Sequence, residues 1–236
     1  MPSGADPADS RAKVKAAAIQ AAVDSVRCEI AAACARVARD PNSVRLIAVT
    51  KNQEPEVIAA LVAAGVHDLG ENRIEHQSLM HAAAHAAGLP VRFHAIGRVQ
   101  GRQLAKLAPM SACLHSLCDR DHVPRLARAC AGAAKPFPVY LQVNTSGEAA
   151  KAGCAPELLA QLLADVRAES TLEAIGLMTM AEEGAPEIQV RQTFSRLRQL
   201  AGDHGLPRLS MGMSQDFVWA IEEGATDIRV GTRLFS

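Results

Sequence analysis

Short apolar segments alternate with helix-like segments along almost the whole chain. Strands are predicted where a segment is short, apolar and rich in β-branched residues. These segments are 45–50, 66–70, 91–97, 112–117, 137–144, 172–180, 208–213 and 226–231. Helices are predicted between and before them, at 8–39, 54–64, 71–87, 119–134, 155–169, 186–202 and 214–223. Because strands that alternate with helices pair in parallel, this order predicts an α/β fold.

Eight such units after an initial helix predict a single (β/α)8 TIM barrel with an extra N-terminal helix, and the chain of 236 residues suits such a barrel. An open doubly wound sheet is the alternative, and periodicity alone does not exclude it. Such sheets usually carry a Gly-rich GxGxxG turn, which is absent here. No linker or shift in composition interrupts the pattern. Residues 1–236 are therefore expected to form one domain, with the 1–40 helix packing on the barrel.

The charge balance limits the kinds of partner that the chain can bind. Lys and Arg number 25 and Asp and Glu number 25, so the formal net charge is zero. Broad binding to nucleic acid needs clustered, uncompensated cations. Aromatic residues make up only 3% of the chain, which is too few for a platform that stacks bases. No nucleic-acid partner is expected.

Cysteines and the N-terminus indicate the compartment. The six cysteines form no CxxC pair, so free thiols in a reducing compartment are favoured over zinc ligands or disulfides. The N-terminus lacks the apolar core of a signal peptide, and no apolar run approaches the ~18 residues of a membrane span. We expect a soluble, cytoplasmic protein with no membrane partner.

Lys51 directly follows the first predicted strand. A TIM barrel builds its active face from residues at the C-terminal ends of its strands, so Lys51 is expected at the barrel mouth. Burial above an apolar core would disfavour the ammonium form and leave an amine that can form an imine with an aldehyde. The alternative is a solvated lysine that merely opens a loop.

Two loops near the C-terminus have the features of a phosphate site. Ser214 is predicted to begin a helix with Asp216 in its first turn, and a helix N-terminus offers N–H donors and partial positive charge to a phosphate. Gly231 and Thr232 follow the last strand and add a backbone N–H and a hydroxyl. The loops after strands 7 and 8 are a frequent phosphate site in TIM barrels. For Ser214 the alternative is an ordinary helix N-cap.

Arg229 lies in the last predicted strand. Alternation places it on the opposite face from its apolar neighbours Ile228 and Val230. An arginine that points into the barrel could donate to a pyridine nitrogen and keep that nitrogen unprotonated. The alternative is an ion pair with Asp227 or Glu223.

Taken together, these segments resemble the pyridoxal 5′-phosphate (PLP) homeostasis protein family, PLP-binding barrels of fold type III that are similar to the N-terminal domain of alanine racemases. The resemblance covers nearly the whole chain. It lies in LIAVTK, which contains Lys51, and in the segments GEN (70–72), FHAIGRVQ (93–100), VNTSGEAAKAG (143–153), GLM (176–178), LSMGMSQD (209–216) and RVGTRLF (229–235).

The resemblance implies that Lys51 carries PLP as a Schiff base and that Arg229 faces the pyridine nitrogen of the cofactor. It implies that Ser214, Gly231 and Thr232 hold the phosphate. Further residues are expected to line the cofactor, namely Asn72, His94, Met178, Ser210 and Met211.

Three functions fit these residues. The first is a non-catalytic protein that carries PLP for intracellular homeostasis and delivers it to apo-enzymes. The second is a PLP-dependent amino-acid racemase, which needs a second acid/base, typically a tyrosine from a separate domain. The only tyrosine here is Tyr140, in the middle of a predicted strand. The third is a sugar-phosphate aldolase that uses Lys51 without PLP, which the motifs do not support. We favour the carrier, acting as a monomer or weak dimer.

Three histidines lie within one predicted helix, at His76, His81 and His85. The spacing of His81 and His85 could hold a metal, but no HExxH glutamate or acidic third ligand accompanies them. No metal site is predicted, and a solvated role is favoured for the three side chains.

Overall fold

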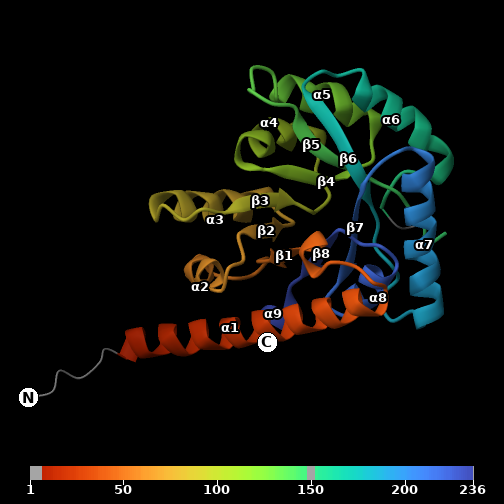
Figure 1. The fold of residues 1–236 in the computed structure, drawn as a ribbon. Helices are drawn as coiled ribbons and strands as arrows, with labels where there is room; N and C mark the ends of the chain where they lie inside the picture. The colour runs from red at the N-terminus through yellow and green to blue at the C-terminus, as the bar shows by residue number, and fades with distance from the viewer. Residues whose placement is uncertain (1–6, 148–151, 236) are drawn as a thin grey trace, which may run out of the picture.

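A computed structural model describes residues 7–147 and 152–235 of the chain and shows a closed barrel (Figure 1). Its strands are β1 (Arg45–Val49), β2 (Asp68–Glu71), β3 (Arg92–Ala95), β4 (Cys113–Leu117), β5 (Phe137–Gln142), β6 (Leu172–Met178), β7 (Arg208–Met213) and β8 (Asp227–Val230). Neighbours in sequence pair in parallel, and β8 pairs with β1 to close the cylinder. The predicted α/β barrel is confirmed, and the open sheet is wrong.

Helices surround the barrel in the order that the sequence predicts. They are α1 (Pro7–Arg36), α2 (Val57–Ala63), α3 (Ile74–Ala86), α4 (Leu104–Leu107), α5 (Val123–Ala129), α6 (Leu159–Arg167), α7 (Glu187–Asp203), α8 (Phe217–Glu222) and α9 (Thr232–Phe235). The short helices α4 and α9 were not predicted individually, because a single turn is too short to show a period of 3.6 residues. Within the described residues, none of the helices is both long and apolar enough to cross a membrane.

The long N-terminal helix α1 lies against the barrel's outer layer beside α2, α8 and α9 (Figure 1). Its buried residues Ile19, Val23, Val26 and Ile30 recur every three or four positions, so they form one apolar stripe. Arg27 adds specific contacts, because its guanidinium donates to the carbonyl oxygens at the end of α2. The stripe and the arginine together fix the helix on the barrel wall.

The strands divide their side chains between two environments. Outward-facing residues such as Ile228 and Val230 belong to the main apolar cluster that also includes the helices. Cys113, Tyr140 and Met178 form a separate, small apolar cluster. Several polar side chains are buried beside it, among them Asp68, His94, His115, Ser210, Asp227 and Arg229. The inside of this barrel is therefore far more polar than the layers of branched apolar residues that usually fill one.

Candidate functional site

Lys51 lies in a tight turn directly after β1. The turn runs from Thr50 to Gln53, and the Gln53 N–H donates to the Thr50 carbonyl oxygen over 2.9 Å. Lys51 and Asn52 occupy its two central positions, and Asn52 has a φ of 64°, which Asn tolerates better than most residues. Lys51 is exposed. The expected burial of this lysine is therefore wrong, because the turn lifts the side chain beyond the barrel core.

The two predicted phosphate loops meet at one hydrogen bond. The Gly231 N–H donates to Ser214 Oγ over 3.1 Å, which joins the loop after β8 to the loop after β7. Gly231 also lies against the last residue of β1, since a Cβ at this position would be 3.3 Å from the Val49 carbonyl oxygen. Val49 is two residues before Lys51. Ser214, Gly231 and the lysine turn therefore share one end of the barrel.

The predicted helix start at Ser214 is wrong, because α8 begins at Phe217. The Asp216 carboxylate accepts a hydrogen bond from the Met213 N–H, and the Asp216 N–H donates to the Met213 carbonyl oxygen. These two bonds close a turn over 213–216 that delays the helix. Thr232 instead stands at the start of a helix, as the exposed first residue of α9.

Arg229 points into the barrel, as alternation predicts, and is almost fully buried. Its Nη1 donates to Ser210 Oγ over 2.6 Å, and its Nη2 donates to the Thr179 carbonyl oxygen over 3.0 Å. Burial lowers the pKa of Arg229 to about 10, so the guanidinium stays charged at neutral pH. Asp227 is bonded by other partners, Tyr140 and Arg208, rather than by Arg229.

A chain of hydrogen bonds continues from Ser210 across the barrel interior. His115 Nδ1 lies 2.8 Å from Ser210 Oγ, and its Nε2 lies 2.9 Å from His94 Nδ1. His94 Nε2 is 2.8 Å from Asp68 Oδ1. A guanidinium only donates and a carboxylate only accepts. Neutral imidazoles that each donate through Nε2 therefore satisfy the whole chain, with every proton pointing from Arg229 toward Asp68.

The pKa shifts of Asp68 and His115 agree with protons that point from Arg229 toward Asp68. Burial alone would raise the pKa of Asp68, but hydrogen bonds from Arg92 and His94 outweigh it and hold that pKa well below its usual range. Burial lowers the pKa of His115 well below its usual value, and the positive charge of Arg229 lowers it further. Asp68 is thus a carboxylate and His115 a neutral imidazole at neutral pH. His94, which was expected beside the cofactor, is fully engaged within this chain.

The remaining predicted site residues fall in three environments. Asn72 follows β2 and is exposed at the barrel mouth. Met178 is buried in the small cluster with Tyr140 and Cys113. Met211 belongs to the outer apolar cluster, because alternation along β7 places it on the opposite face from Ser210. Only the backbone of Met211 can therefore face the barrel interior.

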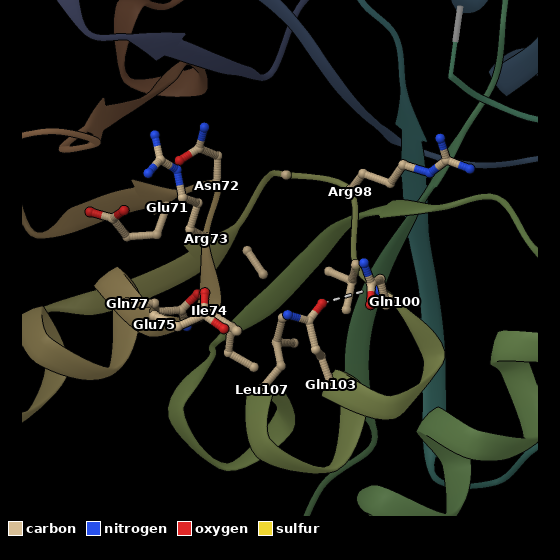
Figure 2. Close-up of a pocket in the computed structure, with 13 residues that line it drawn as sticks. Glu71, Asn72, Arg73, Ile74, Glu75, Gln77, Arg98, Gln100, Gln103 and Leu107 are labelled. Atoms are coloured by element: carbon tan, nitrogen blue, oxygen red, sulfur yellow. Dashed lines mark hydrogen bonds between the residues drawn. The ribbon is translucent and has the colours of Figure 1, made fainter.

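A pocket opens between the loops that follow β2 and β3 (Figure 2). Asn72, Arg73, Arg98, Gln100 and Gln103 are among the polar residues that line it. The two loops touch closely, since a Cβ at Gly97 would be only 2.1 Å from the Asn72 carbonyl oxygen. Glycine at position 97 therefore sets how near Asn72 can lie to the loop after β3.

Tyr140 is held at the end of the barrel opposite Lys51. Its hydroxyl donates to Asp227 Oδ2 over 2.6 Å, and Asp227 is the first residue of β8. Its ring stacks on His115, with 4.3 Å between the ring centroids. Burial and the neighbouring Asp227 carboxylate raise the pKa of Tyr140 well above its usual value. The hydroxyl and the ring of Tyr140 are therefore both held by contacts inside the barrel.

The histidines of α3 do not act as a group. His76 bonds to Glu71 and to the Gln53 carbonyl, whereas His81 packs its ring against Phe93. Among the described residues, one set of potential metal ligands lies close together, namely His94, Cys113 and His115. The four ring nitrogens of His94 and His115 already have partners in the hydrogen-bond chain.

Comparison with known proteins identifies the family. Residues 22–236 match the family model for the alanine racemase N-terminal domain. The chain is 39% identical to the pyridoxal phosphate homeostasis protein of Pseudomonas aeruginosa over 215 residues, which cover 90% of this chain and 93% of that protein. The chain belongs to the pyridoxal phosphate homeostasis protein family. A second member, from Aquifex aeolicus, is 34% identical over 86% of this chain and 91% of that protein.

Solved structures agree with this family assignment. PipY of Synechococcus elongatus, solved with PLP bound, matches with a TM-score of 0.81 and 29% identity over 92% of this chain and all of that one. Alanine racemase from E. faecalis matches with a TM-score of 0.72 at 16% identity, over 92% of this chain and 57% of that one. The racemase likeness shows a shared fold.

The segment VNTSGEAAKAG (143–153), which contributes to the family resemblance, is only partly covered by the structure, because residues 148–151 lie outside the described residues.

Sequence reasoning missed the contacts of several polar residues of this pyridoxal phosphate homeostasis protein family member. Asp68, His115 and Thr179 belong to the interior hydrogen-bond chain, and Glu71 and His76 lie beside the lysine turn. One signal was present, since His115 is a polar residue at an inward-facing alternate position of a mostly apolar strand. A polar residue at such a position indicates a buried partner.

Proposed function

We propose that this chain binds PLP as a Schiff base on Lys51 and acts in intracellular PLP homeostasis and carriage rather than in catalysis, with residues 1–236 as one binding domain. The observation that carries the proposal is the bond between Gly231 and Ser214, with Gly231 packed on the strand that leads to Lys51. It is supported by the PLP bound to PipY and by the names of the relatives from P. aeruginosa and A. aeolicus.

The two C-terminal loops fit a phosphate. The Gly231 N–H and the Ser214 hydroxyl face one another, and no side chain at position 231 stands in the way. Thr232 adds a hydroxyl at the start of α9. In the proposed complex these three residues hold the phosphate, and the exposed Lys51 amine condenses with the PLP aldehyde, forming a C=N bond and releasing one water. When bound, PLP supplies this electrophilic aldehyde.

Arg229 is proposed to face the pyridine nitrogen. As a charged donor it stabilises an unprotonated nitrogen, and Ser210 and the Thr179 carbonyl hold it in place. An unprotonated ring withdraws electrons weakly, which disfavours carbanion chemistry at a bound amino acid. Asn72, His94, Met178, Ser210 and Met211 are proposed around the cofactor, with His94 acting through His115 and Met211 through its backbone.

A carrier role is favoured over a racemase by the position of the single tyrosine. Two-base proton transfer needs an acid/base on each face of the substrate. Tyr140 cannot supply one, because it is buried and bonded to Asp227. We propose apo-enzymes as the recipients of PLP, and a monomer or weak dimer in the cytoplasm as the active form.

Absorbance and chemical trapping test the proposal. The protein incubated with PLP is expected to turn yellow, and borohydride is expected to fix one PLP to Lys51, located by peptide mass spectrometry. Lys51→Ala should abolish the trapped adduct, whereas Lys106→Ala, at an exposed lysine in α4, should not. Equal trapping in Lys51→Ala would refute the site. Racemisation of L-alanine by the yellow protein would refute the non-catalytic role.

A further inference from the structure

Glu71 and His76 enclose the turn that bears Lys51. Thr50 Oγ1 donates to Glu71 Oε1 over 2.5 Å, and Glu71 Oε2 lies 2.8 Å from His76 Nδ1. His76 Nε2 lies 3.0 Å from the Gln53 carbonyl oxygen. The Gln53 N–H donates to the Thr50 carbonyl oxygen, so Thr50, Glu71, His76 and Gln53 form a closed ring of hydrogen bonds. The first and last residues of the turn are therefore bonded to one Glu–His pair.

The members of this ring differ in burial. Thr50 and the side chain of Glu71 are fully buried, and the His76 side chain is 23% exposed. Glu71 is the last residue of β2 and is among the residues that line the pocket between the loops after β2 and β3 (Figure 2). His76 stands in the first turn of α3. The pair therefore ties the lysine turn to two elements that the barrel itself fixes.

The direction of each hydrogen bond follows from the groups present. A carbonyl oxygen only accepts, so His76 Nε2 carries a hydrogen. One further proton must lie between Glu71 and His76, because a carboxylate oxygen and a bare nitrogen would repel each other. An amide at position 71 would satisfy the same ring, since its oxygen accepts from Thr50 and its NH₂ donates to His76 Nδ1.

We propose that Glu71 and His76 are positioning residues for Lys51, which hold its turn so that the amine is presented to an incoming aldehyde. This inference rests on the proposed role of Lys51. The turn needs such support, because Lys51 and Asn52 are both exposed and Asn52 has a left-handed backbone. Reactive groups lose rate steeply when they are displaced by about 1 Å, so a loose turn would slow capture of the aldehyde.

Four variants test the positioning role. Glu71→Leu and His76→Leu remove the ring, Glu71→Gln preserves its hydrogen bonds without charge, and His85→Leu alters an exposed histidine of the same helix. Two quantities are measured in the full-length protein well below its melting temperature. The first is the rate at which Lys51 captures PLP, followed by absorbance and borohydride trapping. The second is hydrogen exchange of the Gln53 amide, measured by NMR without PLP.

Glu71→Leu and His76→Leu are expected to slow capture on the order of 10-fold and to speed exchange at Gln53, whereas Glu71→Gln and His85→Leu match the unaltered protein. Unchanged capture rates in both leucine variants would overturn the proposal. So would a Glu71→Gln variant as slow as Glu71→Leu, because hydrogen bonding would then not be the cause. If the unaltered protein does not trap PLP on Lys51, the proposed function fails, and the Gln53 exchange rates still show whether the ring holds the turn.

Discussion

Tyr140 donates a hydrogen bond of 2.6 Å to Asp227, which begins the strand that carries Arg229. Arg208 and Thr226 bond to the same carboxylate, so the tyrosine is one part of a buried polar cluster at the N-terminal end of the barrel. The chain's one tyrosine therefore contributes to stability, and the end of the barrel that carries Lys51 has none.

Tyr140→Phe is expected to lower the free energy of unfolding by about 1–2 kcal/mol, since Asp227 loses one of several donors. PLP capture by Lys51 should be unchanged, because the hydroxyl lies at the far end of the barrel. Urea denaturation and the trapping assay measure the two effects. A variant of normal stability that no longer captures PLP would show that the hydroxyl acts at the cofactor.

The double variant Ser214→Ala, Thr232→Ala is expected to weaken PLP binding by about 100-fold or more, because each of the two lost hydrogen bonds to a charged phosphate contributes about 1.5–3 kcal/mol. Titration followed by absorbance gives the dissociation constant. Ser170→Ala, at an exposed serine far along the chain from both loops, is the control and should bind normally. Equal affinity of the double variant and the control would remove both hydroxyls from the proposed phosphate site.

Stability should fall between pH 7 and pH 5, in part because of His115. Burial depresses the pKa of His115 in the folded protein below the value of about 6.5 that it has when unfolded. As the pH falls below that value, the unfolded chain gains a proton that the folded chain does not. The loss approaches about 1.4 kcal/mol per pH unit for this one group.

His115→Gln should reduce that dependence, even though it destabilises the protein at pH 7 by disturbing Ser210 and His94. The relevant quantity is the difference in unfolding free energy between pH 7 and pH 5, obtained from urea titrations at each pH. The exposed histidine variant His85→Gln should keep the full difference. An identical pH dependence in His115→Gln would mean that His115 is not the neutral link in the chain.

Gly97→Ala is expected to destabilise the protein by about 1–3 kcal/mol and to weaken PLP binding. The new Cβ would lie 2.1 Å from the Asn72 carbonyl oxygen, so one of the two backbones must move. Gly202→Ala is the matched control, because it lies in α7 with no atom within 4 Å of a new Cβ. It should leave stability unchanged or raise it. Thermal unfolding and PLP titration of both variants compare the two sites.

The sequence by itself determined the alternation of strands and helices that favours a barrel, the inward direction of Arg229 and the placing of Lys51 in the loop after β1. These features depend on local periodicity, since a strand alternates its side chains with a period of two and a helix repeats every 3.6 residues. The same information placed Ser214 and Gly231 after β7 and β8. Family motifs then suggested what such a set of residues binds.

Only the tertiary structure decided which buried polar groups meet. Ser210 bonds to His115, 95 residues earlier, and Glu71 reaches Thr50 from a neighbouring strand. The exposure of Lys51 and the late start of α8 were likewise set by turns closed through hydrogen bonds. Periodicity tells which way a side chain points but not its height in the barrel. That height depends on how closure of the barrel staggers the strands, and it selects each partner.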